Sequence, residues 1–189
     1  MLTNIFELRC RLHSVYAEEV RYRRFDNHFV FGFIRNPFSR EYSLYKLFNR
    51  RINPNVSFKQ WLFEYYDQYS RPQYGFFCDT TGELKVNLYR FEERESSMRA
   101  IAQRLNLDAE RFISYNSKDS VNFNVEDSYI EAYDNEMIDF VAEKRKVDLE
   151  AFGYTFDSYT DVIKNVPFSF DVDTLYYCNE PSPIKCINV

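Results

Sequence analysis

The sequence is poor in glycine and contains no long apolar run. Its 189 residues include four glycines, at positions 32, 75, 82 and 153, and its first lysine is Lys46. Many nucleotide-binding proteins bind phosphates with a glycine-rich loop that contains a lysine. No such loop precedes Arg35, a residue discussed below as a candidate phosphate ligand. No stretch reaches the about 18 apolar residues of a membrane-spanning helix, and the N-terminus lacks a signal-peptide layout. We therefore expect no membrane segment in this chain.

Cysteine and histidine are also scarce. The four cysteines, at positions 10, 78, 178 and 186, show neither metal-ligand spacing nor a close pair, and only two histidines are present. We therefore expect no metal site, and we interpret the cysteines as buried or surface thiols in a reducing compartment. These features predict a cytoplasmic protein.

The composition predicts a folded protein. Apolar residues make up 45% of the chain and aromatic residues 19%, which is enough to bury a core. The sequence contains neither an internal repeat nor a low-complexity linker, so a second domain is unsupported. We predict one domain over residues 1–154, partial at its N-terminus, with residues 155–189 as a C-terminal extension of the same domain.

Charge is distributed unevenly along the chain. Residues 1–52 carry ten Lys or Arg and five Asp or Glu, a balance of +5, whereas the remaining residues carry 14 and 24, a balance of −10. A basic N-terminal part would attract a polyanionic nucleotide. Nucleic acid is a rival partner because arginines and aromatic residues can bind phosphates and stack on bases. We rank it lower because the pI near 5.2 is acidic and no known nucleic-acid-binding module is present.

The most informative segment runs from Phe31 to Ser43. Residues 28–34 form an apolar run that predicts a buried strand of a parallel sheet. Asn36 is a good N-cap and Pro37 suits the first helical position, which predicts a helix over residues 37–50. A helix N-terminus attracts anions, and Arg35 offers a fork of donors suited to phosphate.

Two interpretations of this junction remain open. Ser39, Arg40 and Ser43 share one face of the predicted helix, so together with Arg35 they can form a phosphate site. Alternatively, Arg35 and Arg40 pair with carboxylates such as Glu41 or Glu92, and the serines bond back to the helix. Spacing alone does not favour either interpretation.

Other helices and strands follow from local patterns. Ser57 and Gln60 suggest a capping box before a helix that carries Trp61, Leu62, Tyr65 and Tyr66, and we assign these aromatic residues to the core. The sequence also predicts a strand over 84–89 and a polar loop over 106–125. Two further helices are predicted. The helix over 92–105 would bury Met98, Ile101, Ala102 and Leu105, and the helix over 135–147 would be anchored by Ile138, Phe140 and Val141. Alternating strands and helices predict an α/β sheet.

The residues after the first strand carry a resemblance to a known family. Arg35-Asn36-Pro37, followed by Arg40 and Ser43, resembles the segment that binds the 3′-phosphate of the sulfate donor in carbohydrate sulfotransferases. Further matches follow in family order over roughly residues 13–154: Pro72-Gln73, Asp79 with Gly82, Arg90-Phe91-Glu92, Asn116-Ser117 and Phe152-Gly153-Tyr154. Each match is weak alone, and their order makes the set moderately specific.

The resemblance implies a fold and an activity. The fold would be the parallel sheet flanked by helices that P-loop NTPases share. The activity would be transfer of a sulfuryl group from 3′-phosphoadenosine 5′-phosphosulfate to a hydroxyl, with a carbohydrate as the expected acceptor. Arg35 and Ser43 would bind the 3′-phosphate with support from Arg40, and His13, 22 residues before Arg35, resembles the catalytic base of some relatives.

One part of the family pattern is missing. Relatives carry an upstream loop of Lys, Gly, Thr and Ser that binds the 5′-phosphosulfate, and this sequence has no counterpart. We therefore expect a domain without its first strand, 5′ loop and first helix: a truncated product, a misassigned start or half of a split protein. The alternative to a sulfotransferase is a noncatalytic remnant that binds a nucleotide, or a partner chain through an exposed sheet edge.

Overall fold

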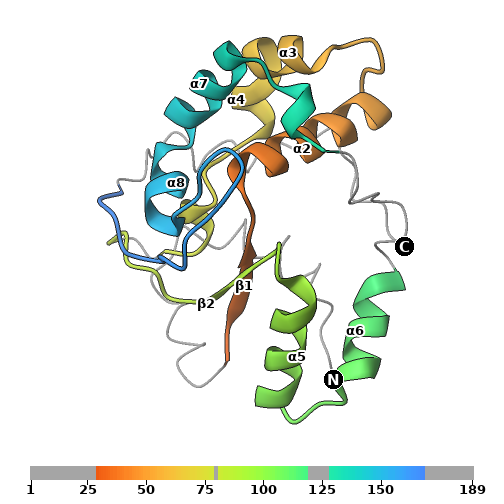
Figure 1. The fold of residues 1–189 in the computed structure, drawn as a ribbon, viewed down its shortest axis with the longest axis vertical. Helices are drawn as coiled ribbons and strands as arrows, with labels where there is room; N and C mark the ends of the chain where they lie inside the picture. Colours follow the sequence, from red (N-terminus) through yellow and green to blue (C-terminus); the bar gives the residue numbers. More distant parts are fainter. Residues whose placement is uncertain (1–28, 79–80, 119–127, 169–189) are drawn as a thin grey trace.

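A computed structural model describes residues 29–78, 81–118 and 128–168 of the chain. These residues form a mixed α/β structure around a two-stranded parallel sheet (Figure 1). In chain order the helices and strands are β1 (Phe31–Ile34), α2 (Pro37–Arg51), α3 (Phe58–Gln60), the π-helical η2 (Trp61–Tyr65), α4 (Tyr66–Tyr69), the 3-10 helix η3 (Tyr74–Phe76), β2 (Asn87–Arg90), α5 (Arg94–Arg104), α6 (Ala109–Lys118), the 3-10 helix η4 (Ile130–Ala132), α7 (Asn135–Lys144) and α8 (Lys146–Phe152).

The strands β1 and β2 pair in parallel, in agreement with the predicted α/β sheet. Phe31 lies opposite Asn87, and Ile34 lies opposite Arg90. A parallel pair needs a long crossover, and the helices between the two strands supply it. Ile34 is fully buried, whereas the other residues of β1 are only partly buried. The strand ends at Ile34, so that Arg35 is the first residue beyond the sheet.

Helix α2 begins as the sequence predicts. The Asn36 side chain caps it by accepting a hydrogen bond from the Phe38 amide at 3.0 Å, and Pro37 occupies the first turn. The helix begins at the end of β1 and runs below α3 in the view of Figure 1, and it contacts α7. This placement brings the first turn of α2 to the carboxyl end of the sheet, where α/β proteins bind ligands.

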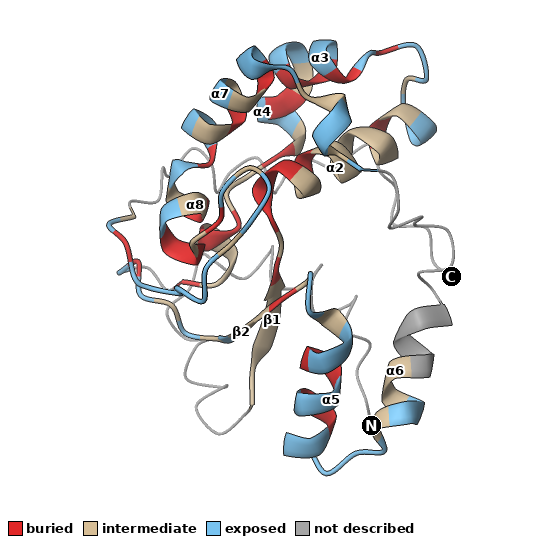
Figure 2. Ribbon diagram, in the orientation of Figure 1, coloured by how far each residue is buried: buried red, intermediate tan, exposed pale blue. Residues whose placement is uncertain are grey.

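The helical stretch that follows α2 contributes aromatic residues to the core, as predicted. Ser57 accepts a hydrogen bond from the Gln60 amide, but the Gln60 side chain donates to Glu64 instead, so only half of the expected capping box forms. Phe58, Trp61, Leu62 and Tyr66 of this stretch are buried, together with Phe38 and Phe48 of α2. Buried residues gather where α2, α4 and α7 face one another (Figure 2).

Two expectations in the middle of the chain are wrong. Met98, Ile101 and Ala102 are buried on α5 as predicted, but Leu105 is 39% exposed because the helix ends at Arg104 and the chain turns at Asn106, whose φ is 52°. The predicted loop over 106–125 contains α6 from Ala109 to Lys118. Asp108 starts this helix by accepting a hydrogen bond from the Arg111 amide.

The helix predicted over 135–147 is instead two helices. Helix α7 ends at Lys144, Arg145 takes a non-helical conformation, and α8 continues to Phe152. Val141 is fully buried as predicted, and Ile138 and Phe140 pack against the core. The chain breaks at Arg145 because this side chain turns inward to a buried carboxylate, described below.

The segment after α8 packs back onto the sheet end. Gly153 ends α8 in the left-handed conformation, with φ at 65°, which glycine adopts without steric cost. Tyr154 and Val166 join a second buried cluster, which contains Ile34, Tyr74 and the Cys78 thiol. None of the described helices is long and apolar enough to cross a membrane.

Candidate functional site

Arg35 lies at the junction between β1 and α2, and its backbone is held on both sides. The Arg35 amide donates to Gln73 Oε1 at 3.0 Å, and Gln73 Nε2 donates to the Arg35 carbonyl at 2.7 Å. The next amide, that of Asn36, donates to Glu92 Oε1 at 2.7 Å. The start of α2 is therefore fixed by side chains from two distant parts of the chain.

The Arg35 side chain lies along the first turns of α2. Its Nε donates to Ser39 Oγ at 2.9 Å, and its guanidinium lies 4.9 Å from the centre of the Phe91 ring. Ser43 follows Ser39 by four residues, so it lies one turn further on the same face. Within the described residues, the two Nη groups of Arg35 and the Ser43 hydroxyl form no hydrogen bond. These groups remain available to an anion.

The charges around Arg35 have opposing effects on its pKa. Burial lowers the pKa of the guanidinium, Glu92 raises it and Arg40 lowers it further. An arginine remains protonated in proteins despite such shifts, because its ordinary pKa exceeds about 12. Arg35 is therefore a partly desolvated cation, and partial desolvation strengthens its interaction with a bound anion.

The helix N-terminus offers less to an anion than the sequence suggests. The Phe38 amide is already bonded to the Asn36 side chain, and Asn36 Nδ2 donates to the Thr155 carbonyl at 2.9 Å. Glu92 also accepts a hydrogen bond from the Tyr154 hydroxyl at 2.9 Å, so both of its oxygens hold protein groups. An anion at this junction would rely on side chains rather than on the capped amide.

The Arg40 side chain does not bond to Ser39 or Ser43 but joins a polar cluster. Its Nη1 donates to Glu41 Oε1 at 2.9 Å, to Ser70 Oγ and to the Arg71 carbonyl. The alternative in which an arginine of this segment pairs with Glu41 is therefore correct for Arg40. The residue still acts on Arg35 through its charge, as the pKa of Arg35 indicates.

The polar cluster around Glu41 is buried, and only its Arg40–Glu41 pair is among the alternatives that the sequence offers. Arg145, 3% exposed, donates from Nε to Glu41 Oε1 at 3.1 Å, and the Ser70 hydroxyl donates to Glu41 Oε2 at 2.6 Å. The Arg145 guanidinium also lies 4.5 Å from the centre of the Tyr66 ring. This cluster connects α2 to the break between α7 and α8, and so holds the helix that carries Ser39 and Ser43.

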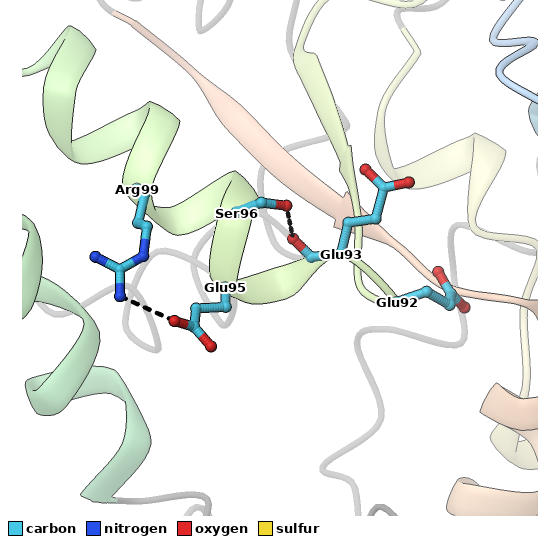
Figure 3. Close-up of a pocket in the computed structure, with 5 residues that line it drawn as sticks. All are labelled: Glu92, Glu93, Glu95, Ser96 and Arg99. Atoms are coloured by element: carbon cyan, nitrogen blue, oxygen red, sulfur yellow. Dashed lines mark hydrogen bonds and ion pairs between the residues drawn. The ribbon is translucent and has the colours of Figure 1, made fainter.

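An open depression of about 380 Å³ lies beside the start of α5 (Figure 3). It is lined by Glu92, Glu93, Glu95, Ser96 and Arg99. Arg99 pairs with Glu95 at 2.9 Å, and the Ser96 hydroxyl donates to the Glu93 carbonyl at 2.9 Å. The carboxylates outnumber the cation, so this depression does not suit a phosphate.

Several predicted residues lie outside the region just described. His13 and Asp79 fall outside the described residues, so the structure does not place the predicted base. The backbone of Asn116 and Ser117 belongs to α6 rather than to the expected loop. Searched over residues 29–78, 81–118 and 128–168, the structure contains no group of three or more His, Cys, Asp or Glu that could hold a metal ion.

Comparison of the chain with protein-family models, with curated proteins and with solved structures finds no match. Its function must therefore be argued from the geometry around Arg35 and from the sequence pattern.

Proposed function

We propose that the β1–α2 junction binds the 3′-phosphate of 3′-phosphoadenosine 5′-phosphosulfate, and that the chain is a sulfotransferase-like protein whose acceptor is a carbohydrate hydroxyl. The observation that carries this proposal is the placement of the Arg35 guanidinium on Ser39, with Ser43 one turn beyond. In this proposal Arg35 and Ser43 bind the phosphate and Arg40 adds positive charge.

The groups at the junction suit a phosphate dianion. A guanidinium with two unengaged Nη groups can bind two phosphate oxygens, and a serine hydroxyl can donate to a third. The Arg35 backbone is fixed by Gln73, so less conformational entropy is lost when the anion binds. The α2 dipole adds a favourable interaction with negative charge.

The remaining parts of the proposal come from the family resemblance. The parallel pair β1–β2 would belong to a sheet like that of P-loop NTPases, with α2 and α5 following its strands. When bound, the donor supplies the sulfuryl group. His13 would accept the proton from the acceptor hydroxyl. Binding of the 3′-phosphate and transfer of the sulfuryl group are separate claims. The sequence contains residues for the first but no counterpart of the loop that binds the 5′-phosphosulfate.

The test is calorimetric titration of the full chain and its variants with 3′,5′-bisphosphoadenosine. We expect Arg35→Ala to weaken binding by about 10- to 150-fold, since a hydrogen-bonded charge contributes roughly 1.5–3 kcal/mol. Ser43→Ala removes one neutral donor and should weaken binding by about 2- to 12-fold.

Arg51→Ala is the matched control for these variants. Arg51 is an exposed arginine in the last turn of α2, so its removal changes the net charge equally without touching the junction. If Arg51→Ala weakens binding as much as Arg35→Ala does, the nucleotide responds only to net charge and the assigned site is wrong.

A second candidate function is association with a partner chain through the sheet. Phe31, Gly32 and Phe33 of β1 are only partly buried, although parallel strands are normally covered on both faces. In this alternative the chain is noncatalytic and binds a partner chain along β1. Light scattering over a range of concentrations tests self-association: a monomer that binds nucleotide at every concentration argues against a required second copy.

A further inference from the structure

The Gln73 side chain contacts the Arg35 backbone and not its guanidinium. We propose that Gln73 is a positioning residue that sets where the Arg35 guanidinium lies; this inference rests on the proposed phosphate site. The side-chain amide accepts from the Arg35 N–H and donates to the Arg35 carbonyl, at 3.0 and 2.7 Å. At this residue, the first beyond β1, the Gln73 side chain makes the two backbone hydrogen bonds that a neighbouring strand would make within a sheet.

Gln73 is itself held in place by a buried carboxylate. The amides of Gln73 and Tyr74 donate to the two oxygens of Asp148, both at 2.8 Å. Asp148 is fully buried on α8, and Gln73 is 5% exposed. A continuous path of hydrogen bonds therefore runs from α8 through Gln73 to the Arg35 backbone.

The contact requires both a donor and an acceptor. A glutamine amide supplies one of each, whereas methionine supplies neither and a glutamate carboxylate only accepts. The Arg35 carbonyl would face a second negative oxygen if Gln73 were replaced by ionised glutamate. Only a neutral side chain of this length matches the two backbone groups.

The position of the Arg35 backbone determines the position of its guanidinium. The side chain must reach Ser39 Oγ at 2.9 Å and still offer its two Nη groups to the anion. A displacement of about 1 Å in a binding constellation can reduce function by about 100-fold. Loss of the Gln73 contact should therefore reduce phosphate binding even though Gln73 does not touch the phosphate.

The test compares Gln73→Met with Gln60→Met by calorimetric titration with 3′,5′-bisphosphoadenosine. Gln60 is an exposed glutamine in α3, so the control makes the same chemical change away from the junction. We expect Gln73→Met to weaken binding by at least about tenfold and Gln60→Met to leave it unchanged. In an Arg35→Ala background, Gln73→Met should cause no further loss, because Gln73 acts only through Arg35.

A pH profile separates positioning from a general structural role. Protonation of Gln73→Glu restores a donor, so its affinity relative to wild type at the same pH should rise as the pH is lowered toward about 4. This variant also keeps the test available if Gln73→Met does not fold. The positioning role would be overturned if the affinity of Gln73→Glu relative to wild type did not change with pH. It would also be overturned if Gln73→Met weakened binding tenfold in the Arg35→Ala background.

The two proposals fail in different ways. If Arg35→Ala leaves binding unchanged, the phosphate site is wrong. If Arg35→Ala weakens binding but folded Gln73→Met does not, the phosphate site stands and the positioning role is wrong.

Discussion

The buried carboxylate of Glu41 gives the sharpest stability prediction. Glu41 is fully buried and accepts hydrogen bonds from Arg40, Arg145 and Ser70 at 2.9, 3.1 and 2.6 Å. Glu41→Gln keeps the shape of the side chain but removes its charge, and turns a donor toward groups that already donate. The Arg145 guanidinium, 3% exposed, then loses the carboxylate to which it is hydrogen-bonded, and the Asp148 carboxyl remains near it.

The expected cost follows from these contacts. Removing one partner of a buried ion pair destabilises a protein by about 3–5 kcal/mol. The Arg40 side chain is 20% exposed and can be rehydrated, so we expect a value near the lower limit, about 3 kcal/mol. This loss is a large part of the ~5–15 kcal/mol that stabilises a typical domain.

The assay is urea unfolding monitored by tryptophan fluorescence. Trp61 is the only tryptophan, and its ring lies 5.8 Å from the ring of Tyr66, which packs under Arg145. A loss below about 1 kcal/mol for Glu41→Gln would refute the reasoning, since it would match a surface ion pair. The double variant Glu41→Leu with Arg145→Met removes both charges and should be more stable than Glu41→Gln alone.

Three further predictions test single features of the fold. Gly153→Ala should lower the thermal midpoint, because the left-handed conformation costs about 1–2 kcal/mol for a residue with a Cβ and the added carbon would clash with Thr160. An unchanged midpoint would contradict the role of Gly153 in ending α8. The pKa of Asp134 is lowered by the hydrogen bond from the Met137 amide and by Lys59, so the ionised carboxylate stabilises the fold above about pH 4, and this stabilisation is lost as the pH falls through the lowered pKa. The difference in thermal midpoint between wild type and Asp134→Asn should therefore shrink as the pH is lowered. A difference that does not change with pH contradicts this prediction. Burial and Glu92 raise the pKa of Tyr154, so Tyr154→Phe should leave the tyrosinate absorbance unchanged up to about pH 11, and the loss of one ionisation below that pH contradicts the raised value.

Local chemistry made the β1–α2 junction predictable. Asn36 and Pro37 act through atoms within a few residues of the helix start, so their pattern predicted the cap. The pattern of Trp61, Leu62 and Tyr66 likewise predicts their burial, because large apolar side chains are usually buried in folded proteins. At this junction, local signals over one helical turn are enough to predict the start of α2.

Contacts between distant residues could not be predicted. Gln73 binds a backbone 38 residues away, and Arg145 breaks a helix to reach Glu41 across 104 residues. Helix α6 was missed because its stretch of sequence is polar, although Asp108 is a typical N-cap. Polar contacts between distant residues leave no periodic pattern in a sequence. The contacts of Gln73 and Arg145 are therefore seen only in the structure.

The central claim is that the junction recognises a 3′-phosphate. Its most direct test is the affinity of the wild-type chain for 3′,5′-bisphosphoadenosine compared with adenosine 5′-phosphate, which lacks that phosphate. The account predicts that the bisphosphate binds at least about tenfold more tightly, as expected for one charge-assisted contact. Equal affinities for the two nucleotides would contradict it.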